Sequence, residues 1–173
     1  MKQQIIVSGL GGQGAVTVTR WLGEAALALG LPVLTSETHG MAQRGGTVIS
    51  MVKVGDFHGP LIPWGTAEVG LFLHPGNLAV HGGYVRPEGV AVVNTPAPGP
   101  YLAVDGLGVA LREGLRPVAA NLVVLGYAAG RGLLFCEAGL LAEIIGGHTP
   151  EGHREAHLRA FRAGVAAAQE AGG

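Results

Sequence analysis

The residues Gly9 to Gly14 have the pattern G-x-G-x-x-G, which links a predicted strand to a predicted helix. They follow the apolar run Ile5 to Ser8, and they precede apolar residues at helical spacing that end before Gly30. A second apolar run at 31–37 predicts another strand. A strand, a glycine turn, a helix and a strand form a βαβ unit, so we expect the sheet to begin parallel.

The rest of the chain continues the alternation of strands and helices. Gly55-Asp56 indicates a turn, after which Phe57-His58 is expected to return as a hairpin. No internal repeat and no long linker is visible, so the prediction is one α/β domain over 1–173. We expect a Rossmann-like, doubly wound, mostly parallel sheet with helices on both faces. Further strands are predicted at 47–54, 69–73, 90–94 and 101–104, and helices at 108–112, 122–129, 138–145 and 151–171.

The composition limits the possible partners. Charged residues make up 13% of the chain, against about a quarter in an average soluble domain. Either the core is large and tight, or other chains cover part of the surface. The almost wholly apolar helix at 122–129 is expected to be buried against the sheet or against such a partner. A net charge of −1 gives no indication of nucleic-acid or membrane binding.

The sequence also bears on the cellular compartment of the protein. No apolar run approaches the length of a membrane span, and the chain starts with a strand instead of a signal peptide. The single cysteine, Cys136, excludes an internal disulfide and an iron–sulfur cluster held by this chain alone. We expect a cytoplasmic protein in which Cys136 fills the core.

The glycine turn allows three interpretations. A helix N-terminus presents free N–H groups and a partial positive charge to an anion, and Glu37 lies where a ribose-binding acid would lie. The turn could therefore hold a nicotinamide or flavin dinucleotide. It could hold a different phosphate-bearing ligand, or it could serve only close packing of strand and helix.

The segment that follows the second strand carries the most polar chemistry. Glu37, His39, Gln43 and Arg44 place a carboxylate, an imidazole, an amide and a guanidinium before Gly45-Gly46. Ligands of open α/β sheets bind at the carboxyl ends of strands, where this loop is predicted. Arg44 could grip a carboxylate or a phosphate with two parallel hydrogen bonds. The alternative is a solvated loop with a structural ion pair.

Together these two segments, Gly9 to Gly14 and Glu37 to Gly46, resemble the gamma subunit family of 2-oxoacid:ferredoxin oxidoreductases, which includes subunits of indolepyruvate, pyruvate and ketoisovalerate enzymes. Two weaker matches are Asn94-Thr95, which ends a later strand, and Asn121, which opens the apolar helix. The resemblance runs from the first strand to about Ile145.

The resemblance implies a role within a complex. Such enzymes oxidatively decarboxylate a 2-oxoacid on thiamine diphosphate, pass electrons through iron–sulfur clusters to ferredoxin and release an acyl-CoA. The thiamine and cluster sites belong to partner subunits, so this chain alone is expected to bind no cofactor and to have no activity. Its motifs are expected to face the active site near coenzyme A. The candidate contact residues are Gly9, Gly11, Gly12, Gln13, Gly14, Glu37, His39, Gln43, Arg44, Gly45, Gly46, Asn94 and Asn121.

Two other functions stay open at this point. One is a small independent NAD(P)- or flavin-binding reductase that uses the glycine turn and Glu37. The other is a nucleotide-sensing module without chemistry. As a subunit without its partners, the chain is expected to dimerise or aggregate.

Weaker signals indicate no further site. His153 and His157 share a helix face near His148, but no carboxylate completes a metal motif, so no metal is predicted. Ser8 and Ser36 lie at strand ends without a recognisable partner histidine, so a hydrolase is not indicated.

Overall fold

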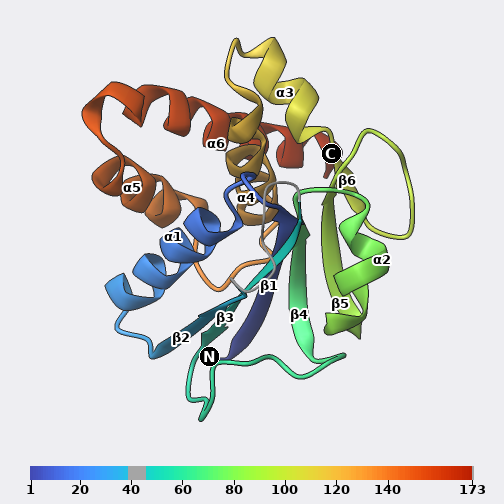
Figure 1. Cartoon of the computed structure of the whole chain (residues 1–173). Helices are drawn as coiled ribbons and strands as arrows, with labels where there is room; N and C mark the ends of the chain where they lie inside the picture. Colours follow the sequence, from blue (N-terminus) through green and yellow to red (C-terminus); the bar gives the residue numbers. More distant parts are fainter. Residues whose placement is uncertain (39–45, 173) are drawn as a thin grey trace.

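The computed structural model describes residues 1–38 and 46–172 as a six-stranded sheet with helices packed on it (Figure 1). The strands lie in the order β2-β3-β1-β4-β5-β6. Their bounds are β1 (Gln3–Leu10), β2 (Val33–Glu37), β3 (Thr47–Val54), β4 (Ala67–Phe72), β5 (Val85–Asn94) and β6 (Leu102–Val104). The helices are α1 (Ala15–Ala28), α2 (Asn77–His81), α3 (Gly106–Arg112), α4 (Ala120–Gly130), α5 (Ala138–His148) and α6 (Glu151–Ala171), with short 3₁₀ turns η1 (Gly82–Tyr84) and η2 (Pro117–Ala119).

The sheet is mostly parallel, as predicted, but one strand is inverted. β1, β4, β5 and β6 pair parallel, whereas β3 pairs antiparallel with both β1 and β2. β2 therefore has the direction expected of a βαβ unit, but it is not the neighbour of β1. β3 lies between β2 and β1 inside the sheet. Its residues from Val48 to Val54 are buried, as expected of a strand that is covered on both faces.

Helices cover the two faces of the sheet unequally. Helices α1, α4, α5 and α6 lie over one face, and the larger core forms between them and the sheet (Figure 1). The short helix α2 and the segment around Ile62 cover the other face, where Ile6, Met51 and Phe72 form a smaller core. The α/β prediction with helices on both faces is confirmed.

Helix α4 is buried within its own chain. Its residues from Ala120 to Ala129 are all buried, and it packs against α6 on one side and the sheet on the other. The two helices approach closely at glycines, because a Cβ at Gly126 would overlap the Phe161 carbonyl oxygen and one at Gly164 the Val123 carbonyl oxygen. The apolar run at 122–129 thus needs no partner chain to cover it.

The hairpin predicted at Phe57-His58 is wrong. The residues between β3 and β4 form no strand and instead run along the smaller core. Lys53 fixes this segment, since its Nζ donates to the Leu61 carbonyl oxygen at 2.8 Å and lies 4.8 Å from the centre of the Phe57 ring. Pro60 and Pro63 lack the N–H groups that a returning strand would need.

Helix α2, which the sequence did not indicate, is attached to β1 by a buried polar cluster. The Ser8 hydroxyl lies 2.7 Å from Nδ1 of His81, and Asn77 Nδ2 donates to Ser8 Oγ at 2.8 Å and to the Gly9 carbonyl oxygen at 2.9 Å. Ser8 therefore has a histidine partner, contrary to the sequence prediction. Because Ser8 is fully buried, this pair holds the fold and cannot reach a substrate.

The glycine contact between α4 and α6 can be tested with one methyl group. Gly164→Ala should lower the free energy of unfolding by about 1–3 kcal/mol, because the rigid Val123 carbonyl cannot move aside without separating the helices. The matched control is Gly152→Ala in the same helix, where a Cβ would meet nothing within 4 Å. If urea denaturation gives the same free energy of unfolding for Gly164→Ala and Gly152→Ala, the close approach of α4 and α6 at Gly164 is contradicted.

The buried cluster predicts a dependence of stability on pH. Burial lowers the pKa of His81 below 6.5, so the unfolded chain takes up a proton at a higher pH than the folded chain does. The contribution of the neutral His81 ring to the free energy of unfolding is therefore complete above pH 6.5. It is lost as the pH falls toward the pKa of His81 in the folded chain. The free energy of unfolding should fall less between pH 7.5 and 5.5 in His81→Gln than in the wild type. Equal losses in both proteins would exclude this role of His81.

Candidate functional site

The glycine turn at the end of β1 is closed by backbone hydrogen bonds. Gln13 N–H donates to the Leu10 carbonyl oxygen at 3.1 Å, and Gly11 N–H donates to the Gly46 carbonyl oxygen at 2.8 Å. Gly12 and Gly14 have φ angles of +90° and +84°, in the left-handed region that favours glycine. The backbone therefore requires glycine at both positions, and the turn is tied to the residue that leads into β3.

Side-chain amides pack around this turn. Gln13 Oε1 accepts from Leu10 N–H at 2.6 Å, and Gln13 Nε2 donates to the Leu73 carbonyl oxygen at 3.1 Å. Asn121 Nδ2 donates to the Gly14 carbonyl oxygen at 3.4 Å, and a Cβ at Gly14 would overlap that same nitrogen. The turn thus fits against the start of α4 because position 14 lacks a side chain.

Asn94 makes an equivalent connection on the next strand. Its Nδ2 donates to the Leu73 carbonyl oxygen at 3.1 Å, and its Oδ1 accepts from Leu107 N–H at 3.3 Å. Gln13, Asn94 and Asn121 together line a cavity of about 20 Å³, large enough for about one water molecule. The structure therefore brings the three predicted amides together, with Gln13 and Asn94 bonded to backbone through both ends of the amide.

An open cavity of about 450 Å³ surrounds the glycine turn and the start of α1. The N-cap residue Gly14 has no side chain that could cap α1, and the first turn of α1 contains no acidic residue. The first N–H groups of α1 have no partner within the helix. The partial positive charge at this helix end favours an anion. The cavity is lined by Leu10, Gly11, Gly12, Gly14, Ala15, Val16, Thr17, Thr38, Val48 and Val118.

Part of the predicted loop belongs to a segment that the structure does not describe. His39, Gln43, Arg44 and Gly45 lie outside the described residues. The flanking residues Thr38 and Gly46 are described. Thr38 lines the cavity, and Gly46 accepts the hydrogen bond from Gly11. The two residues that flank this segment therefore both lie beside the glycine turn.

Glu37 lies apart from the glycine turn. It ends β2, and β3 lies between β2 and β1, which separates the two strands by about 10 Å. Glu37 lines a different cavity, on the side of α1 that carries Arg20 and Glu24. The order of the strands, which no local pattern reveals, thus removes the carboxylate from the place that a ribose-binding acid would take.

The described histidines and Cys136 are not grouped as metal ligands. His153 and His157 stack with ring centres 6.1 Å apart, and His148 Nε2 lies 3.6 Å from Glu24 Oε2. Within 1–38 and 46–172, no group of three or more His, Cys, Asp or Glu residues could hold a metal ion. Cys136 lies in the larger core, and burial raises the pKa of its thiol to about 11, which keeps the sulfur protonated and unreactive.

Several residues of the cavity could not be found from the sequence. Val118 reaches the glycine turn from η2, more than a hundred residues along the chain, and Val48 belongs to a segment that the sequence predicts only as a strand. Neither residue lies in a motif, whereas Thr38 lies in the Glu37 to Gly46 segment but is not among the predicted contact residues. In the described part of the chain, no helix combines the length and the apolar character needed to cross a membrane.

Known proteins are similar to this chain in sequence and in fold. The family model for pyruvate ferredoxin/flavodoxin oxidoreductase matches residues 4–167. An indolepyruvate oxidoreductase subunit IorB from Methanothermobacter thermautotrophicus is 31% identical, and the alignment covers 98% of this chain and 100% of that protein. The IorB of Archaeoglobus fulgidus is 43% identical over 95 residues, which cover 55% of this chain and 47% of that protein, so this match spans about half of the relative's length.

Solved structures share the fold. The gamma subunit of a keto/oxoacid ferredoxin oxidoreductase from Geobacter sulfurreducens has a TM-score of 0.78 and 24% identity, with 97% of this chain and 99% of that chain covered. A 2-oxoglutarate:ferredoxin oxidoreductase from Magnetococcus marinus, solved with 2-oxoglutarate, coenzyme A and succinyl-CoA bound, has a TM-score of 0.80 and 21% identity over 98% of this chain and 31% of that chain. With the family model matched over nearly the whole sequence, the chain belongs to the pyruvate ferredoxin/flavodoxin oxidoreductase family, as a subunit of a 2-oxoacid:ferredoxin oxidoreductase of the IorB and gamma type.

Proposed function

We propose that this subunit supplies the coenzyme A side of the active site in a complex that oxidatively decarboxylates a 2-oxoacid and reduces ferredoxin. The observation that carries the proposal is the uncapped start of α1, which opens into a cavity of about 450 Å³ at the carboxyl end of β1. Such a helix start, approached through glycines, suits a phosphate group. Arg44 belongs to segment 39–45, which lies between Thr38, a lining residue of this cavity, and Gly46, which accepts from Gly11 N–H. We propose that its guanidinium contacts the same anion.

The residues of the cavity fit the phosphate end of coenzyme A. A Cβ at Gly12 would meet nothing within 4 Å, so the backbone at this point is open to a ligand. The first N–H groups of α1 would donate to phosphate oxygens. Coenzyme A supplies the thiol that receives the acyl group, and this chain's role is to hold the other end of the molecule. The bound coenzyme A of the Magnetococcus marinus enzyme supports this choice of ligand.

The substrate we propose is an aryl 2-oxoacid of the indolepyruvate kind, with pyruvate and branched-chain 2-oxoacids as alternatives. The support comes from the IorB relatives, which match along almost the whole chain. The pocket for the 2-oxoacid would be built largely by the thiamine-binding subunit. The proposed identity of the substrate therefore rests on the relatives, and no residue of the described cavities contributes to it.

Partner subunits would supply the remaining chemistry. With a single cysteine, this chain cannot provide the thiolates of an iron–sulfur cluster by itself. We propose that thiamine diphosphate and the clusters are held by partner subunits, through which electrons reach ferredoxin in the cytoplasm. Leu107, Leu111 and Val118 are exposed near the carboxyl edge of the sheet and suit a contact with these subunits. The chain without them is expected to dimerise or aggregate.

The alternative function, an independent NAD(P)- or flavin-dependent reductase, has less support. In a dinucleotide-binding fold the acid that binds ribose ends the strand beside β1. Here β3 occupies that place, and the Gly46 carbonyl oxygen takes the N–H of Gly11. The strand beside β1 therefore carries Thr47 and Val48 at this edge of the sheet, and neither offers a carboxylate to a ribose.

Arg44→Ala should reduce the activity of the reconstituted complex and leave the fold of this chain intact. Loss of one partner of a buried charge pair costs about 2–5 kcal/mol, so kcat/KM for coenzyme A should fall about thirtyfold or more. Arg44→Lys should restore little, since the ammonium group lacks the fork geometry. Steady-state kinetics against coenzyme A test this, with circular dichroism of the mutant chain beside them.

The matched control is Arg162→Ala, which removes an exposed arginine from α6, away from the glycine turn. It should leave the kinetics unchanged. If Arg44→Ala also leaves them unchanged, the loop is ordinary surface and the proposed coenzyme A contact is wrong.

The isolated chain should bind NAD and NADP no more tightly than about 1 mM, equivalent to about −4 kcal/mol. The physical reason is the inserted strand β3, which separates Glu37 from the glycine turn. Isothermal titration calorimetry tests this, with Glu37→Ala as the companion variant. A micromolar site that is lost in Glu37→Ala would instead support the reductase.

A further inference from the structure

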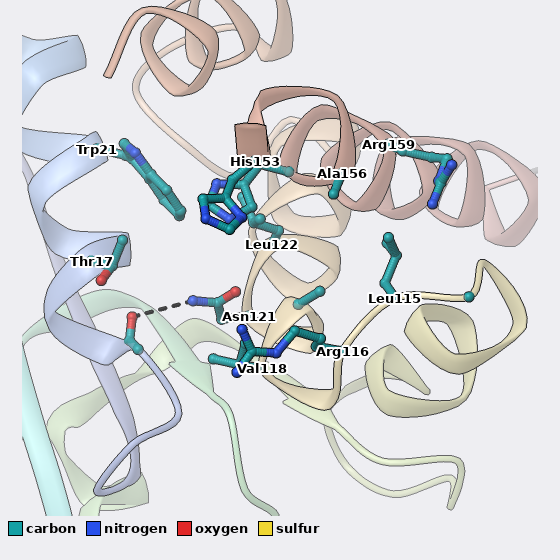
Figure 2. Close-up of a pocket in the computed structure, with 14 residues that line it drawn as sticks. Thr17, Trp21, Leu115, Arg116, Val118, Asn121, Leu122, His153, Ala156 and Arg159 are labelled. Carbon is teal, nitrogen blue, oxygen red and sulfur yellow. Dashed lines mark hydrogen bonds between the residues drawn. The ribbon is translucent and has the colours of Figure 1, made fainter. Parts of the chain in front are cut away.

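A second cavity, of about 410 Å³, lies on the other side of the start of α1, between α1, α4 and α6 (Figure 2). The first turn of α1 separates it from the cavity around the glycine turn, and only Gly14, Thr17 and Val118 line both. Its size is in the range of small-molecule sites, which begins at about 300 Å³. The proposed coenzyme A site lies in the cavity around the glycine turn and leaves this second cavity without an assigned ligand.

One wall of this cavity is aromatic. The Trp21 side chain points into it from α1 (Figure 2), and Trp21 is only 4% exposed. The His157 ring meets the Trp21 ring edge-on at 6.1 Å, and His153 stacks on His157. Leu115 and Leu122 add apolar surface. A flat ring could therefore lie against the half-buried Leu115 and His157 and meet the small exposed part of Trp21.

His157 is held as a neutral ring. The Thr149 hydroxyl donates to the Ile145 carbonyl oxygen at 2.6 Å, so the Thr149 oxygen accepts from Nδ1–H of His157 at 3.2 Å. Burial, and to a smaller extent the nearby His153, lowers the pKa of His157. The ring is thereby fixed in orientation, and it contributes aromatic surface at neutral pH.

The charged groups at the rim have one sign. Arg116 and Arg159 line the cavity, whereas none of the lining residues, all of which are described, is an aspartate or glutamate. Arg159 Nη2 already donates to the Glu113 carbonyl oxygen at 3.1 Å, with Nε at 3.9 Å from Glu113 Oε2. Arg116 is exposed and has no carboxylate within ion-pair distance among the described residues. In a chain of net charge −1, this cavity is a positive, apolar site.

From this combination we propose that the cavity binds a small aromatic carboxylate, with its ring against Trp21 and His157 and its carboxylate on Arg116. The guanidinium of Arg116 can hold a carboxylate through two parallel hydrogen bonds. Asn121, which tethers the glycine turn through Gly14, lines the same cavity (Figure 2). A ligand here would therefore lie one side chain away from the turn.

The test uses the full chain and 2-naphthoate, with 2-naphthamide and inorganic phosphate as matched probes. The chain has two tryptophans, and Trp64 does not line the cavity, so its indole N–H signal in a nitrogen–proton NMR spectrum is an internal control. We expect 2-naphthoate to shift the Trp21 signal with a dissociation constant below about 1 mM. The Trp64 signal should stay in place, and the two other probes should leave Trp21 unshifted.

Two variants separate charge from shape. Arg116→Gln should weaken 2-naphthoate binding about tenfold or more, whereas Arg112→Gln, an exposed arginine outside the cavity, should not. Ala156→Phe should fill the cavity and abolish binding. No shift of Trp21, an equal response to 2-naphthamide or phosphate, or unchanged binding in Arg116→Gln would each overturn the proposal.

Discussion

The antiparallel pairing of β1 with β3 determines where the candidate site residues lie. All residues of β1 from Gln3 to Leu10 pair with β3, and the register ends with Leu10 opposite Thr47. The next residues, Gly11 and Gly46, then meet through a backbone hydrogen bond of 2.8 Å. The described residues on either side of segment 39–45, Thr38 and Gly46, are thereby brought to the glycine turn, and Glu37 is moved to an outer strand. The inserted strand thus separates Glu37 from the glycine turn at which we propose a phosphate site.

Side-chain amides make this arrangement rigid. Gln13, Asn94 and Asn121 bond to backbone groups at the ends of β1 and β4 and at the starts of α1 and α3. Buried polar groups must be paired, so these contacts fix the geometry at the carboxyl edge without a ligand. Within the described residues, the backbone N–H groups in the first turn of α1 remain available to a ligand at this edge. This arrangement agrees with the proposed role of the chain, in which it holds one end of coenzyme A.

The cavity around the glycine turn and the cavity beside Trp21 share few lining residues. Gly14 separates them, and Asn121 contacts Gly14 from the side of the aromatic cavity. Any side chain at position 14 would displace Asn121. The glycine turn and the lining of the cavity beside Trp21 therefore share one contact between α1 and α4.

The sequence by itself determined the α/β class, most of the strands and helices, and the glycine turn, because these depend on local periodicity and on the backbone freedom of Gly12 and Gly14. The pairing of β3 with β1 was decided only by the tertiary structure, since strand order depends on contacts between distant segments. The same reason applies to Ser8 with His81, to Val118 beside the glycine turn, and to the cavity that Trp21 shares with Arg116. In each case the chemistry comes from residues far apart in the chain, which no local pattern can place together.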